Sequence, residues 1–297
     1  MEPWIFVTLG AASAQTLRFM LQKRLASGTL TAAGATFARF VWSAPLVAVA
    51  AVLYGAASGQ GLPVPEAGFW PYALIGGIAQ ILATICTVSL FKHRNFAVGI
   101  TFKKTEVLLS ALVGIVVLGE AISWGAFWAI CLGLVGVLLL SRTPGLAQAR
   151  FWNRATALGL ASGLGFAISA VGYRGATLGL ASGDALLRAL VTLACVTAAQ
   201  TLILGAWLLW RERGEVGRVL RSWRVSGLVG ITSMIGSACW FTAFAMQTVA
   251  LVKAVGQAEL ILSALVSVLV FGERITRTEG LGMIVLGASI VALVLVT

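Results

Sequence analysis

Three ionisable side chains interrupt one of the apolar stretches of this sequence. Lys103, Lys104 and Glu106 stand in "TFKKTEVLLS", between the runs "NFAVGI" and "ALVGIVVLG". A charge near the centre of a bilayer costs about 2.5–3.5 kcal/mol on insertion scales, so such residues usually pair or face a polar cavity. Because residues three apart on a helix share a face, we expect Lys103 and Glu106 to neutralise each other partly. Together, lysines and a carboxylate could bind both charged groups of a small zwitterion.

A second copy of this stretch lies in the other half of the chain. "EVLLSALVGIVVLGE" from Glu106 matches "ELILSALVSVLVFGE" from Glu259 without a gap, so Gln257 is the repeat partner of Lys104. Both copies should therefore present polar groups at matching depths. Other polar or aromatic residues at mid-span are candidates for the same cavity. The predicted substrate-binding residues are Lys103, Lys104, Glu106, Gln257, Glu259, Trp240, Gln80 and Gln15.

The elements that must position these residues are membrane-spanning helices. The chain of 297 residues is 59% hydrophobic and 10% charged, and its mean hydropathy is +0.98, which lies far from the balance of a soluble domain. About 20 apolar residues span the hydrocarbon core as a helix. We predict an all-α membrane protein with ten transmembrane helices, at about 4–25, 31–55, 69–91, 96–118, 121–141, 155–176, 183–210, 226–247, 249–271 and 278–296.

The repeat extends over the whole chain. "LGAAS" from Leu9 pairs with "LGLAS" from Leu158, and Arg39 pairs with Arg188. The chain then consists of two five-helix repeats, 1–148 and 149–297, which form one integrated transport domain. Because five is odd, the second repeat enters the membrane upside down, and inverted repeats of this kind often rock about a site near the bilayer midplane.

The net charge of +11 is a topology signal rather than a sign of nucleic-acid binding. The basic residues concentrate in the odd-numbered connections, at 23–24, 92–94, 142–154, 211–224 and 274–277, whereas the even-numbered ones offer little beyond Arg174. By the positive-inside rule, the odd connections are cytoplasmic. We expect a multi-pass protein of the inner (plasma) membrane with both termini on the outer, periplasmic side.

The duplicated helix end carries a family resemblance. "LSALVGIVVLGEAIS", its second copy "LSALVSVLVFGERIT" and the following "GLGMIVLGASIVAL" resemble the drug/metabolite transporter superfamily, and within it the EamA-type bacterial exporters of amino acids and metabolites. The resemblance covers essentially the full length. In that family a proline often follows the intramembrane glutamate, whereas here Val107 and Leu260 follow it, so this sequence departs from the family pattern and lacks the proline that would kink the helix.

The charges of the predicted cavity separate the candidate functions. A cavity with both positive and negative side chains suits a zwitterion, whose carboxylate would bind lysine and whose ammonium group would bind glutamate. This favours a secondary exporter of amino acids that works by alternating access. An exchanger of phosphorylated or nucleotide-linked sugars is the alternative, but the last helix has no cation after Arg277. A pump for lipophilic cations of the small four-helix type is disfavoured. That type is characterised by a glutamate deep in helix 1, and helix 1 here has none beyond Glu2. An enzyme acting on lipid-linked substrates is disfavoured because no nucleophile or metal set converges, and we expect no cofactor.

Single residues keep competing interpretations. Lys103 and Lys104 could reach the headgroups along their aliphatic stems, and Lys253 does so more easily. Glu106 and Glu259 could form purely structural pairs. Since the residue three before Glu259 is glycine, we interpret Glu259 as the less compensated carboxylate and the candidate for carrying protons. The expected partners are thus a small-molecule substrate, protons as a candidate coupling ion, and the bilayer.

Overall fold

The computed structural model describes residues 2–26, 28, 30–90, 103–140, 154–262 and 276–296. Within these ranges, regular secondary structure consists of helices. They are α1 (Pro3–Ala26), α2 (Ala32–Ser58), α3 (Phe69–Leu90), α5 (Glu106–Leu118), α6 (Trp124–Leu140), α7 (Arg154–Leu178), α8 (Ala185–Arg211), α9 (Glu215–Arg221), α10 (Trp223–Met246), α11 (Val249–Gly256) and α13 (Arg277–Leu295).

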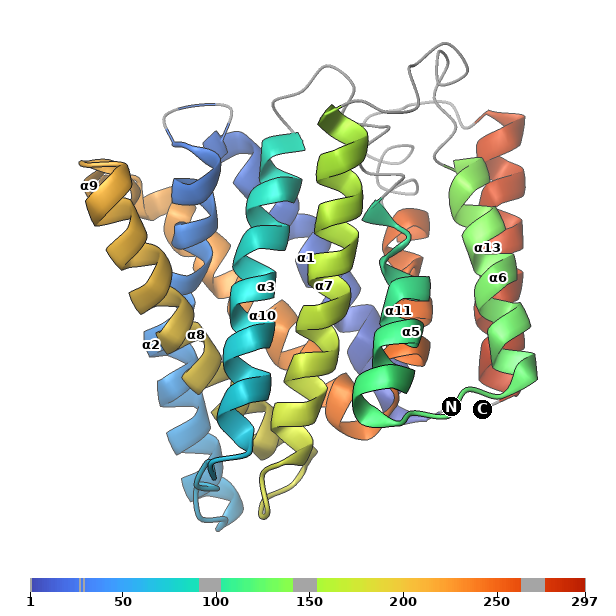
Figure 1. Cartoon of the computed structure of the whole chain (residues 1–297), viewed down its shortest axis with the longest axis horizontal. Helices are drawn as coiled ribbons and strands as arrows, with labels where there is room; N and C mark the ends of the chain where they lie inside the picture. The colour runs from blue at the N-terminus through green and yellow to red at the C-terminus, as the bar shows by residue number, and fades with distance from the viewer. Residues whose placement is uncertain are drawn as a thin grey trace.

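The long helices run alongside one another through the full height of the molecule (Figure 1). In the described ranges, α2, α3, α7, α8 and α10 are long and apolar enough to cross a membrane, and shorter apolar helices accompany them within α5, α6 and α13. A helix satisfies its own backbone N–H and C=O groups, which lipid cannot do. The chain is therefore an all-helical, multi-pass membrane protein.

Helix ends follow local sequence signals. Thr31 is the N-cap of α2 and Asp184 is the N-cap of α8. Each side chain accepts a hydrogen bond from a backbone N–H of the first turn. Gly59 ends α2 with φ +69° and Gly119 ends α5 with φ +65°. These left-handed conformations favour glycine because a Cβ would be strained there.

Two of the predicted spans are not continuous helices. In the span predicted at 96–118, a turn at Lys104 and Thr105 precedes the start of α5 at Glu106. In the span predicted at 249–271, α11 ends at Gly256 and a turn follows at Gln257. Residues 96–102 and 263–271 lie outside the described residues. The prediction of unbroken helices is wrong at these two turns, which form without proline because the backbone there lies inside protein rather than in lipid.

Helices from the two halves of the chain pack against each other. In the described ranges, α3 packs on α7, α1 on α10, α2 on α8 and α6 on α13. Glycines let α3 and α7 approach closely, since a Cβ on Gly172 would lie 2.8 Å from the Tyr72 carbonyl oxygen and one on Gly165 would lie 3.0 Å from that of Ala79. Small residues at a contact are typical of membrane helices.

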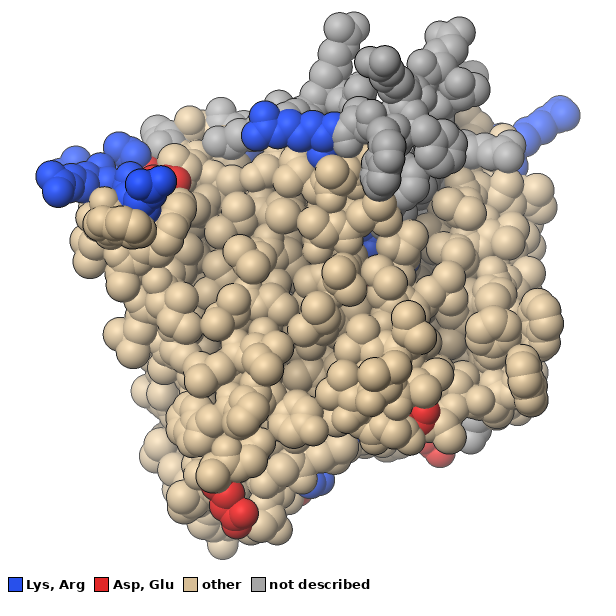
Figure 2. All heavy atoms as spheres, viewed as in Figure 1, with Lys and Arg blue, Asp and Glu red and all other residues tan. Residues whose placement is uncertain are grey.

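Charged side chains gather at the two edges of the visible face. Lys and Arg lie mostly along the edge that carries α9, Asp and Glu are prominent at the opposite edge, and an apolar band separates the two (Figure 2). The helix α9 falls in the connection 211–224, where no helix is predicted, and it bears Arg218 and Arg221. The band is the part of the surface that a bilayer would cover.

Candidate functional site

The two helix breaks bring the predicted charged residues together. Lys103 and Lys104 precede α5, while Gln257 and Glu259 follow α11, and α5 packs on α11. The break before α5 rests on α7 at Gly163, where a Cβ would lie 2.9 Å from the Lys103 carbonyl oxygen. This close approach holds the polar turn inside the bundle.

One ion pair crosses from the first break to the second. The Nζ of Lys104 lies 3.7 Å from the Oε2 of Glu259, and the Nε2 of Gln15 on α1 donates to the same oxygen at 3.0 Å. Lys104 is 3% exposed and Glu259 14%. The interpretation of Glu259 as the less compensated carboxylate is therefore wrong, because its compensation comes from the other half of the chain rather than from its own helix.

A second ion pair joins a lysine of the second half of the chain to a carboxylate of the first half. The Nζ of Lys253 on α11 lies 3.8 Å from the Oε1 of Glu106, and both side chains are buried. The same ammonium lies 4.8 Å from the ring centroid of Trp240. Lys253 therefore does not reach toward the headgroups as the sequence indicated. The Oε2 of Glu106 is buried and has no hydrogen-bond partner among the described residues.

Lys103 lies between aromatic rings instead of beside Glu106. Its Nζ is 4.9 Å from the ring centroids of both Phe19 on α1 and Phe166 on α7. Among the described residues no ion pair within 4 Å joins Lys103 to Glu106, because the turn at 104–105 removes the helical spacing of three, but the two charges still attract each other. Cation–π contacts of this kind stabilise a buried ammonium without a carboxylate.

A polar cavity of about 30 Å³ lies beside these pairs. Gln15, Gln80 and Trp240, all predicted, contribute to its wall. Its other lining residues are Arg39, Phe166, Ser169, Ala170, Tyr173, Ser237, Phe241, Phe244 and Lys253. A cavity of this size holds about two water molecules. In this conformation it is too small for an amino acid, so entry of a substrate requires the walls to move apart.

Arg39 is the main functional candidate that sequence reasoning underrated. Its guanidinium is buried and donates to Ser233 at 2.9 Å, to Ser237 at 3.1 Å and to Thr84 at 3.3 Å. These bonds join α2 to α10 and α3, as expected of a residue that holds the halves together. An arginine within a long apolar segment is itself a functional signal.

Gln200, which was also missed from the sequence, holds two residues of the cavity wall by hydrogen bonds. The Nε2 of Gln200 on α8 donates to the Oε1 of Gln80 at 3.0 Å, to the Tyr173 hydroxyl at 3.1 Å and to the Gly77 carbonyl oxygen at 2.9 Å. Gln200 is fully buried, so this network fixes Gln80 of α3 and Tyr173 of α7 in the cavity wall from α8 behind them.

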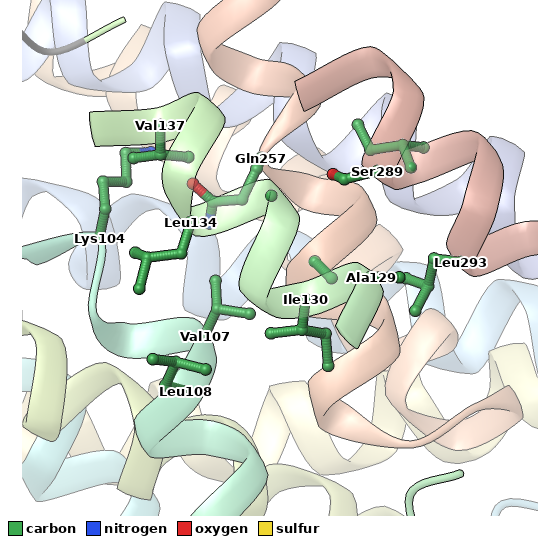
Figure 3. A pocket seen from close by; sticks show the side chains of 13 residues that line it. Lys104, Val107, Leu108, Ala129, Ile130, Leu134, Val137, Gln257, Ser289 and Leu293 are labelled. Atoms are coloured by element: carbon green, nitrogen blue, oxygen red, sulfur yellow. The ribbon is translucent and has the colours of Figure 1, made fainter. Parts of the chain in front are cut away.

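Lys104 and Gln257 face a second, smaller cavity, of about 20 Å³. Most of its wall is apolar and comes from α5, α6, α11 and α13, as the labelled Leu134, Ile130 and Leu293 illustrate (Figure 3). The Oε1 of Gln257 is buried and has no partner among the described residues. Five of the eight predicted residues are thus divided between these two cavities, whereas Lys103, Glu106 and Glu259 line neither of them.

Three comparisons place the chain among known proteins. A comparison with curated proteins gives no match. Among solved structures, one named only "Crystal structure of protein" is similar to this chain, with a TM-score of 0.74 and 15% sequence identity, over 99% of this chain and 96% of the other. At this identity the likeness establishes the fold alone.

The third comparison concerns protein families. Residues 153–295 match the EamA-like transporter family, which comprises membrane transporters of small molecules and not enzymes. The match agrees with the resemblance to the drug/metabolite transporter superfamily that the duplicated helix end indicated. Through residues 153–295, just under half of its length, this chain is similar to the EamA-like transporter family.

Proposed function

We propose that the protein exports amino acids or similar small zwitterionic metabolites across the inner membrane by alternating access. The observation that carries the proposal is the crossed arrangement of buried ion pairs, Lys104 with Glu259 and Lys253 with Glu106, each joining one half of the chain to the other. A zwitterion offers the same two charges, so it can replace contacts of these pairs when the halves separate.

Each charged group of a zwitterionic substrate has a candidate partner at this site. The partnerless Oε2 of Glu106 can accept the ammonium group, and Lys103 and Lys104 can hold the carboxylate. Lys103 rests only on aromatic rings, so a carboxylate would be its first anionic contact within 4 Å among the described residues. The ring of Trp240 offers an apolar surface for the rest of the molecule.

The reciprocal packing of the helices supports two inverted five-helix repeats, 1–148 and 149–297. The contact of α3 with α7 has its counterpart in that of α1 with α10, and the contact of α5 with α7 in that of α11 with α1. The helix breaks at Lys104 and Gln257 are equivalent by the sequence repeat. In transporters, broken helices at the repeat interface are typical of the substrate site.

The distribution of charge supports a cytoplasmic location for the edge with α9. Lys and Arg mark that edge (Figure 2), whereas both termini lie at the opposite edge (Figure 1). By the positive-inside rule, the termini then lie outside. The polar cavity of about 30 Å³ is too small for a substrate and so corresponds to a closed conformation. Opening toward one edge and then toward the other would complete the transport cycle.

Transport by the purified protein in proteoliposomes tests this function. A panel of labelled amino acids is offered with and without an imposed pH gradient, and liposomes without protein serve as the control. We expect counterflow of at least one amino acid and its loss in Lys103→Ala/Lys104→Ala. A gradient that leaves the rate unchanged would remove protons from the proposal, and no counterflow of any amino acid would overturn the substrate class.

A further inference from the structure

Arg39 is a buried cation whose hydrogen-bond partners are all neutral. Ser233, Ser237 and Thr84 accept its bonds, and no carboxylate lies within 4 Å of it among the described residues. Burying a guanidinium is costly unless an anion compensates it. The Arg39 side chain nevertheless lines the polar cavity of about 30 Å³, so a mobile anion in that cavity could reach it.

Hydrogen-bond donors are plentiful around this cavity. The indole N–H of Trp240 is buried and has no partner among the described residues. The Tyr173 hydroxyl also lines this cavity and has Gln200 and Ser169 as hydrogen-bond partners. Lys253 adds an ammonium group, but it is already paired with Glu106. The wall therefore favours an acceptor with negative charge.

The charge balance of the buried polar region points the same way. Among the described residues, five cations are buried there and only two carboxylates accompany them, Glu106 and Glu259. The cations are Arg18, Arg39, Lys103, Lys104 and Lys253. A zwitterion carries no net charge, so its binding would leave this excess uncompensated. A substrate with a further negative group would reduce it.

We propose that the cavity at Arg39 is a subsite for a second acidic group, and that the transported molecules are acidic amino acids rather than neutral ones. The inference rests on the proposed function and names the substrate class of the same site. Phe166 lines the Arg39 cavity and also carries Lys103 over its ring at 4.9 Å, so the subsite adjoins the lysines proposed for the α-carboxylate. One molecule with two carboxylates can therefore reach both.

A carboxylate fits this subsite better than a sugar phosphate. The planar guanidinium of arginine binds a carboxylate through two parallel hydrogen bonds. The rings of Tyr173, Phe241 and Phe244 confine the cavity to about 30 Å³, which suits a small group more than the larger head of a sugar phosphate.

Competition between isosteric ligands tests the subsite. Purified protein in detergent is titrated with L-glutamate and with L-glutamine, which has the same shape but lacks the second negative charge. We expect glutamate to bind about tenfold or more tightly than glutamine, because bonds to a charged group are stronger than neutral ones. In Arg39→Gln the ratio of the two affinities should fall to about one, and Arg39→Lys should retain part of the preference.

Arg188 provides the matched control, since it is the repeat partner of Arg39 and does not line the cavity. The variant Arg188→Gln should keep the preference for glutamate. Equal binding of glutamate and glutamine by the parent protein, or tighter binding of glucose 6-phosphate, overturns the subsite even if Arg39→Gln fails to fold. Binding of no amino acid at all would instead refute the proposed function, so the two failures are distinguishable.

Discussion

The two intramembrane carboxylates differ in how their oxygens are satisfied. Glu259 receives a hydrogen bond from Gln15 and pairs with Lys104 through one oxygen, whereas Glu106 has Lys253 at 3.8 Å and a second oxygen without a partner among the described residues. A partnerless buried oxygen is costly and therefore ready to accept a donor. Glu106 is thus better placed than Glu259 to bind the ammonium group of a substrate.

Replacing Glu106 with glutamine should weaken binding of a transported amino acid by about 10- to 100-fold, because a hydrogen bond to a charged group contributes about 1.5–3 kcal/mol. Isothermal titration of the purified protein measures this change. The deaminated acid of the same skeleton is the control, and it should bind parent and Glu106→Gln equally because it has no ammonium group. A parallel loss for both ligands would point to damage of the whole site.

Sequence reasoning indicated that the charged residues face the interior of the bundle but not which residues they pair with. Lys104, Glu106 and Glu259 interrupt apolar spans, and they are buried or largely buried. Their pairing depends on which residues of the other half face them, and no single-helix pattern contains that information. For the same reason Lys253 was assigned to the headgroups, although its partner Glu106 holds it inside.

At the scale of elements, the break before α5 depends on a glycine in α7. In Gly163→Ala, the added Cβ would lie 2.9 Å from the Lys103 carbonyl oxygen, which is backbone and cannot rotate away. We expect the variant to be less stable by about 1–3 kcal/mol, as for other overpacked sites. Thermal unfolding in detergent measures the loss.

The matched control for this substitution is Gly227→Ala in α10, where nothing lies within 4 Å of the added Cβ. Alanine is a better helix former than glycine by up to about 1 kcal/mol, so this variant should be as stable as the parent or more so. Equal unfolding temperatures for the two variants would show that α7 and α5 can separate at no cost.

The start of α8 is stabilised by a carboxylate that also binds residues at the C-terminal end of α2. Asp184 accepts hydrogen bonds from the Leu187 backbone N–H at 2.8 Å, from Gln60 at 2.9 Å and from Tyr54 at 2.8 Å. The Leu187 N–H, followed by Gln60, lowers the pKa of this carboxyl below its ordinary value. The ionised form is therefore the one that stabilises the fold.

Asp184→Ala should lower the free energy of unfolding by about 0.5–2 kcal/mol at neutral pH, the usual effect of losing an N-cap. Because the folded-state pKa is lowered, the stabilisation is present above the ordinary pKa of aspartate and is lost as the pH falls through the lower, folded value. Thermal melts at a series of pH values check this. A difference between variant and parent that persists undiminished below that range would contradict the assignment.

Helices were predictable here, whereas the interruptions within them were not. Hydropathy averaged over about 19 residues reports a span, but a turn of one or two residues leaves the average unchanged. The turns at Lys104 and Gln257 therefore escaped prediction, as did α9, which is short and basic. No proline marks these breaks, since Val107 and Leu260 follow the two glutamates.

For the whole molecule, the orientation in the membrane is the property most directly open to experiment. Ser58 ends α2 at the edge with the termini, and Leu220 is 46% exposed on α9 at the basic edge. On a background without the four native cysteines, we expect Ser58→Cys to react with an impermeant maleimide in intact cells. Leu220→Cys should react only after the cells are permeabilised, and the reverse pattern would invert the proposed topology.

The excess of buried cations over carboxylates also bears on the energy source of the cycle. A membrane potential contributes about 2.3 kcal/mol per elementary charge moved through 100 mV. If an acidic substrate reduces this excess by one charge, the loaded site crosses the field with one positive charge fewer than the empty site that returns. With the cytoplasm negative, voltage would then pull the empty carrier back inward after each release. Such an exporter would run on electrical potential alone, and the return step would register as an inward current on a planar membrane.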